Sequence, residues 1–195
     1  MTPIIINVES GGKLELGDLG ISGNLNASLT LKSGDILHFK SNATLRVKKN
    51  SQINVGAGAK LIIDGASILD LVDANSKIVI QDGGELIING QPNITGNGHI
   101  RFEYGNTFTL NSNLLLNGNN RNHTLIVIAQ SATVKVSSPV ELRFENATIL
   151  KESGASFAPR HIWLRSGATL RANNVLFGKL LFMSSPGKVL RVASN

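Results

Sequence analysis

The sequence predicts an all-β fold, a right-handed parallel β-helix (solenoid) of about eight coils, each of roughly 24 residues and three short strands. Two observations predict it. An eight-residue pattern recurs along nearly the whole chain, and Gly and Asn return at every third repeat of that pattern. Helix is not expected, because no window of ten or more residues has apolar side chains at i, i+3, i+4 and i+7. Residues 1–195 are therefore predicted to form a single parallel β-helix domain.

Each eight-residue unit, here called an octad, reads as one short strand and one corner. Residues 33–64 read SGDILHFK SNATLRVK KNSQINVG AGAKLIID, with a small or turn-prone residue at the second place of each octad. The third, fifth and seventh places are mostly small, apolar and apolar, whereas the fourth and sixth are mostly polar. Because alternate residues of a strand point to opposite faces, the odd places are predicted to point inward and the even places outward.

The corners give the period of the coil. Gly recurs at the second place of every third octad, with Ser131 substituting once, and Asn recurs in the next set. Spacings within the two sets are 22 to 26 residues; the members are Gly11, Gly34, Gly58, Gly83, Gly105, Ser131 and Gly154, and Asn26, Asn50, Asn75, Asn97, Asn122 and Asn146. Both residue types tolerate the left-handed backbone of a tight corner. The fifth places after the Gly corners are predicted to stack inside the coil; they are Leu14, Leu37, Leu61, Leu86, Phe108, Val134 and Phe157. Right-handed winding follows the general rule for parallel crossovers.

The phrases GAKLIIDG (58–65), GGELIING (83–90) and SGATLRA (166–172) carry a resemblance. They resemble the short-coil right-handed parallel β-helix repeats of secreted and surface-displayed bacterial proteins. The resemblance implies a group of architectures that includes adhesins, passenger domains and pectin-lyase-like enzymes, and no single activity. It also implies a secreted or cell-surface location, and we expect the chain to be a segment of a longer protein, although its first residues do not form a signal peptide.

The composition and the charge distribution limit the kinds of partner that the chain is expected to bind. The chain has no Cys, which excludes disulfides and thiolate sites, and no apolar run of about 18 residues that would span a membrane. Residues 121–195 hold 10 of the 19 Lys and Arg but only 3 of the 13 Asp and Glu. This basic third favours an anionic partner such as acidic polysaccharide or a cell-surface glycan. Nucleic acid is disfavoured because no dense basic run or interleaved aromatic stripe occurs.

The short corners predict smooth walls without a catalytic cleft, which argues against an enzyme. Two clusters of outward side chains are nevertheless candidate sites. His99, Arg101 and Glu103 alternate in GHIRFEYG and so share one face, where they could abstract a proton next to a sugar carboxylate. The alternative interpretation is a solvated strand face with cross-strand charge pairs.

The second cluster is a candidate ligand-binding face. Glu141, Arg143 and Glu145 alternate in VELRFE, and His161, Trp163 and Arg165 alternate in RHIWLR. Stacking of the two octads would place Glu141 beside His161, Arg143 beside Trp163, and Glu145 beside Arg165. An exposed indole next to guanidinium groups would suit a sugar ring or an anionic glycan. The alternative is a ladder of cation–π contacts and salt bridges.

No metal site and no cofactor are predicted. Asp64, Asp70, Asp73 and Asp82 are near in sequence but fall on different corners, and the pairing of Asp64 with Asn89 is typical of turns. The sequence thus favours a non-catalytic structural or adhesive solenoid of an exported bacterial surface protein. The alternative is a glycan-binding or polysaccharide-cleaving β-helix that uses the Arg143/Trp163 face. Open strand edges at the ends of a solenoid also predict end-to-end self-association.

Overall fold

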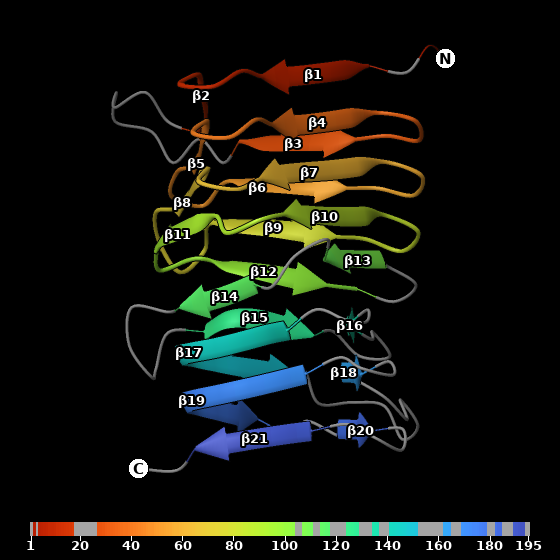
Figure 1. The fold of residues 1–195 in the computed structure, drawn as a ribbon. Helices are drawn as coiled ribbons and strands as arrows, with labels where there is room; N and C mark the ends of the chain where they lie inside the picture. Colours follow the sequence, from red (N-terminus) through yellow and green to blue (C-terminus); the bar gives the residue numbers. More distant parts are fainter. Residues whose placement is uncertain are drawn as a thin grey trace.

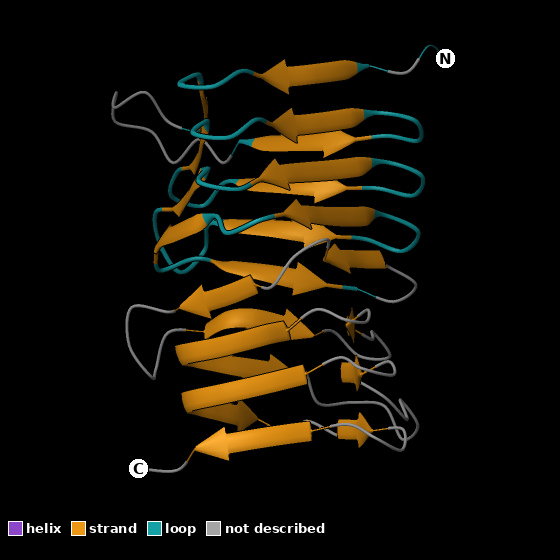
Figure 2. Cartoon of the chain, viewed as in Figure 1, coloured by secondary structure: helices purple, strands orange, loops and turns teal. Residues whose placement is uncertain are grey.

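The computed structural model describes most of the chain backbone, and side chains mainly in its first half. Backbone is described for residues 2, 4–17, 27–103, 107–110, 114–117, 124–128, 134–136, 141–151, 162–164, 169–178, 182–184 and 189–193. Side chains are described up to residue 103 within these ranges, and at residues 114–116 and 125–127. Every regular element in these ranges is a β-strand, and every strand pair is parallel (Figures 1 and 2).

The strands stack into three walls, called here faces A, B and C. Face A contains β1 (Ile5–Val8), β4 (Ile36–Phe39), β7 (Lys60–Asp64), β10 (Glu85–Asn89) and β13 (Thr107–Leu110). Face B contains β2 (Lys13–Leu16), β5 (Thr44–Val47), β8 (Ile68–Leu71) and β11 (Asn93–Gly96). Face C begins with β3 (Ser28–Leu31), β6 (Gln52–Val55), β9 (Lys77–Ile80), β12 (His99–Phe102) and β15 (Thr124–Ile128).

Consecutive strands belong to different faces, so the chain circles the core as predicted. Three complete coils follow one another: β4–β5–β6, β7–β8–β9 and β10–β11–β12. In Figure 1 the strands of face A lie one below another, and those of face C run the opposite way across the view. The predicted fold class, a parallel β-solenoid, is confirmed, although the described residues contain three complete coils of this kind and not the predicted eight.

The core is the stack of inward side chains. On face A one column of register partners contains Leu37, Leu61 and Leu86, followed by Phe108. The three leucines are fully buried. Burial of each such side chain is worth roughly 1.5–3 kcal/mol. Most third places of the octads are small and also buried; they include Ala43, Ser51, Ala59, Ser67 and Ser76, whereas Asp35 is partly exposed. The alternation of inward and outward places is therefore confirmed in the three coils.

Two of the buried serines join neighbouring coils at the corners. The Ser67 hydroxyl lies 3.1 Å from the carbonyl of Lys40, and the Ser76 hydroxyl donates to the carbonyl of Lys48 at 2.9 Å. Each carbonyl belongs to the same corner one coil earlier. These contacts give hydrogen-bond partners to buried polar groups, which would lower the stability of the fold if they were left without one.

Corner residues of different types can share one left-handed backbone conformation. Positive φ angles occur at Gly58 (72°), Asn42 (64°), Asn50 (55°) and Ala66 (59°). The predicted asparagine ladder is present at one corner, where the Asn75 side chain donates to Asn50 Oδ1 at 2.9 Å. Since Gly, Asn and even Ala serve in the same role, the residue type at a corner does not identify its face.

This equivalence explains why the predicted phase of the first coil is wrong. Leu14 pairs with Leu45 on face B, whereas Leu37 pairs with Ile6. Gly11, with φ of 76°, therefore occupies the corner position of Asn42 and not that of Gly34. Eleven residues separate β2 from β3, compared with four between β5 and β6, so the first coil is longer than the predicted period.

The C-terminal third also departs from the predicted coil of three short strands. Its long strands extend face C, with short strands in a fourth sheet; they are β17 (Glu141–Lys151), β19 (Thr169–Gly178) and β21 (Val189–Ala193), and β16 (Val134–Val136), β18 (Ile162–Leu164) and β20 (Phe182–Ser184). The first part of β17 pairs with β14 (Leu114–Asn117) and the second part with β15. The predicted corner at Asn146 thus lies inside a continuous strand. Residues 140–151 contain no Gly or Pro, and Asn tolerates a left-handed corner without requiring one.

Candidate functional site

The candidate site is a groove on the outer surface of face C. It follows one column of outward side chains, in which Ser28 pairs with Gln52, Gln52 with Lys77, and Lys77 with His99. These residues are the first in β3, β6, β9 and β12. Adjacent strands of a sheet lie about 4.8 Å apart, so the column presents one polar side chain per coil at that interval along the solenoid axis.

The groove has a volume of about 420 Å³ and lies between this column and the asparagine corner. Asn50 and Asn75 form its second side. Among the lining residues that the structure describes there is no Asp or Glu, and the charged or chargeable groups are the Lys77 ammonium and the His99 imidazole.

Hydrogen bonds fix the amides beside the groove. The Asn54 amide donates to Ser28 Oγ at 3.0 Å and to Thr30 Oγ1 at 3.2 Å, and it accepts from Gln52 Nε2 at 3.1 Å. Asn54 points outward from β6, yet it is only 8% exposed because its neighbours cover it. A polar side chain so buried and so fully bonded holds Ser28 and Gln52 in defined orientations.

Lys77 differs from Lys60 and Lys13, two other lysines on strands, in its ion pairing. Lys60 lies 3.0 Å from Glu85 on face A, and Lys13 lies 2.5 Å from Glu15 on face B. Lys77 is half-buried and forms no ion pair with any residue whose side chain the structure describes. Its charge is thus available to a ligand.

The structure places the predicted trio of His99, Arg101 and Glu103 on one outer face, as expected. All three are partly exposed, whereas the intervening Ile100 and Phe102 are buried. Arg101 Nε lies 3.3 Å from Glu103 Oε1, so the carboxylate is engaged by the guanidinium. This charge pair lies along one segment of chain and not across two strands, so it does not test the predicted cross-strand pairs, and a catalytic role for the trio stays a prediction.

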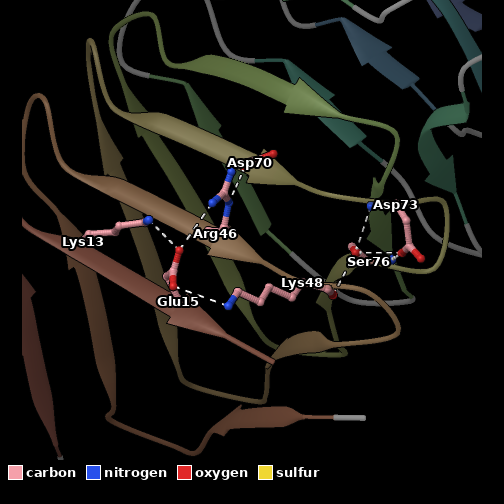
Figure 3. Close-up of polar contacts among 7 residues, drawn as sticks. All are labelled: Lys13, Glu15, Arg46, Lys48, Asp70, Asp73 and Ser76. Atoms are coloured by element: carbon pink, nitrogen blue, oxygen red, sulfur yellow. Dashed lines mark hydrogen bonds and ion pairs between the residues drawn. The ribbon is translucent and has the colours of Figure 1, made fainter. Parts of the chain in front are cut away.

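Face B carries a charge ladder that crosses three coils (Figure 3). Glu15, Arg46 and Asp70 are register partners, with Arg46 2.6 Å from Asp70 and 3.5 Å from Glu15. The hydrogen bond from Lys13 is the main cause that lowers the pKa of Glu15, and the bond to Asp70 is the main cause that raises the pKa of Arg46. Because these charges satisfy one another, the ladder stabilises the stack and offers little to a ligand.

The four aspartates considered for a metal have separate roles. Asp64 accepts from Asn89 Nδ2 at 2.9 Å, as predicted, and its other oxygen lies 2.9 Å from His38 Nε2. Desolvation raises the pKa of Asp64, but the hydrogen bonds from Asn89 and His38 outweigh it, so the pKa is lowered overall.

Asp73 accepts the backbone N–H of Ser76 at 2.9 Å and so closes its corner (Figure 3). Asp70 is bound by Arg46, and Asp82 stands in an exposed turn. Among the residues that the structure describes, no three such side chains group as metal ligands.

The second predicted cluster does not have the predicted register. Arg143 pairs with Arg171 and Glu141 with Thr169, whereas Trp163 pairs with Lys135 in another sheet. The stacking of Arg143 on Trp163 was wrong because β17 is one long strand that aligns with β19 and not with β18. His161 and Arg165 lie outside the described residues, as do the side chains of Glu141, Arg143 and Trp163. Ligand binding by these residues stays a prediction.

Sequence reasoning missed Ser28, Asn50 and Gln52 as groove residues. The available signal was the fourth place of each face C octad, which is polar and never acidic from β3 to β12.

None of the described segments forms a helix that could cross a membrane. No family model, curated protein or solved structure matches this chain.

Proposed function

We propose that the chain is a non-catalytic structural or adhesive β-solenoid segment of an exported bacterial surface protein. The observation that carries this proposal is the uniform shortness of the corners. From β4 to β12, the segments between consecutive strands contain only two to five residues. Polysaccharide-processing sites on such folds need longer corner insertions to build a cleft, whereas short corners produce a continuous wall. A stiff, regular rod suits display and spacing.

Three further features support a structural role. The core is continuous across the coils, buried serines join neighbouring corners, and opposite charges alternate along face B. Each coil therefore makes most of its contacts with the coils before and after it, as in other repeat proteins. The length of such a rod depends on the number of coils.

Removal of one whole coil tests this proposal. Deletion of residues 58–82 joins residue 57 to Gly83, which has the same φ of 72° as Gly58, and brings β10 onto β4 in the register of β7. We expect a folded, shorter solenoid that melts cooperatively by circular dichroism at a lower temperature. The control deletes residues 58–69, which breaks the sequence of faces and should prevent folding. A whole-coil deletion that unfolds as completely as the control contradicts the proposal.

The surface location has its own test. Antibodies against the chain should label intact cells of the source organism, and external protease should remove the signal. Labelling that requires permeabilised cells would refute export to the surface.

The alternative function, glycan binding at Arg143 and Trp163, has weaker support because these residues are not strand partners. It makes a distinct prediction. Trp163→Ala should reduce retention of the protein on acidic polysaccharide without a large change in melting temperature. Unchanged retention would end this alternative.

A further inference from the structure

We propose that the face C groove binds an acidic polysaccharide that lies along the solenoid axis, with a ligand carboxylate on Lys77. This inference does not rest on the structural role proposed above, and it concerns β3, β6, β9 and β12, whereas Arg143 and Trp163 lie on β17 and β18. It is argued from the charge, the spacing and the rigidity of the groove.

The charge of the groove selects an anion. Lys77 is half-buried, has no carboxylate partner among the described side chains, and has His99 as its neighbour in the next coil. None of the described residues that line the groove is an Asp or Glu that would repel an anionic ligand. Faces A and B differ in this respect, because Lys60 is paired with Glu85, and Arg46 with Asp70. A charge-assisted hydrogen bond from an unpaired ammonium is the strongest single contact that the groove offers.

The spacing of the groove selects a chain of repeated polar units. Ser28, Gln52, Lys77 and His99 follow one another at strand separation, about 4.8 Å. This interval is close to the length of one pyranose ring in an extended polysaccharide. Successive sugars would therefore meet successive coils, with hydroxyls on the Ser, Gln and Asn side chains and one carboxylate on Lys77.

The rigidity of the groove favours binding. Asn54 holds Ser28 and Gln52 by hydrogen bonds, and Asn75 holds Asn50 at 2.9 Å. Side chains that are already ordered lose little conformational entropy when a ligand arrives. Gln52 Oε1 and the Asn50 amide hydrogens take part in none of the bonds above and remain for sugar hydroxyls.

Affinity electrophoresis through gels that contain polygalacturonate tests the proposal. We expect the wild-type chain to be retarded, and Lys77→Gln to weaken the apparent affinity about tenfold. Lys60→Gln is the matched control, because it removes the same charge from face A and should leave retardation nearly unchanged. Gln52→Glu, which adds a carboxylate beside the column, should weaken binding as Lys77→Gln does, and circular dichroism should show every variant folded.

Three outcomes would overturn the proposal. One is the absence of wild-type retardation at low ionic strength. Another is an equal effect of Lys60→Gln and Lys77→Gln, which would mean that only the net charge attracts the polymer. The third is inhibition by free galacturonate at the same concentration of uronate groups as the polymer, since a ligand spread over several coils must compete better than its monomer.

Discussion

Truncation of Leu61 to Ala should be among the most destabilising single changes in the three coils. Leu61 is 0% exposed and stacks between Leu37 and Leu86. The lost carbons contribute about 2.4 kcal/mol at about 0.8 kcal/mol each, and the cavity adds to this because the strand ladders hold both neighbours in place. We expect the free energy of unfolding in urea to fall by about 3–4 kcal/mol.

The adjacent residue is the matched control. Ile62 lies on the same strand and loses a similar number of carbons on truncation, but it is partly exposed on the outer surface of face A. Ile62→Ala should lower the free energy of unfolding by only about 1 kcal/mol. Equal losses for the two variants would refute the inward and outward alternation on which the fold argument depends.

Three further predictions concern the corners and the charges. Gly96→Ala should lower the melting temperature much more than Gly11→Ala. A Cβ at residue 96 would lie 1.9 Å from the Leu71 carbonyl oxygen, whereas a Cβ at residue 11 would meet nothing within 4 Å. Similar melting temperatures of the two variants would contradict this prediction. The pKa of Asp64 is lowered from its ordinary value of 3.8, so its contribution to stability is present above about pH 4 and lost as the pH falls further. In urea titrations, Asp64→Asn should remove part of that acid dependence, and an unchanged pH profile would contradict it. Arg46→Gln should lower the melting temperature at low salt but have almost no effect in 1 M NaCl, since salt screens a surface ladder; an effect that persists at high salt would exclude screening as the explanation.

The fold was predictable because inward and outward places obey simple steric and hydrophobic rules. Leu37, Leu61 and Leu86 follow the octad pattern, and their register agrees with it. The phase of the first coil was not predictable, since Gly11 and Asn42 adopt the same left-handed corner and the sequence does not separate them. The long β17 was missed for a related reason. Asn146 permits a corner without requiring one, and the neighbouring strands decided the outcome.

The candidate site was predictable only in part. The alternation in GHIRFEYG placed His99 on an outer face, and the strand register adds Lys77 as its neighbour in the preceding coil. The groove itself depends on Asn54, whose burial on an outward position follows from the side chains around it and not from its own place in the octad. Such packing among surface residues of different coils leaves no periodic signal in the sequence.

The parallel ladders of the three faces also determine how this object would respond to tension. The hydrogen bonds between coils run along the axis of the stack, from β4 to β7 to β10 on face A and likewise on the other two. A force that pulls the ends apart loads these ladders in series, so each coil junction bears the whole force. Coils should therefore peel away one at a time from an end. Under load the rod would lengthen in repeated steps, each releasing one coil of chain, and so dissipate mechanical work without breaking all at once.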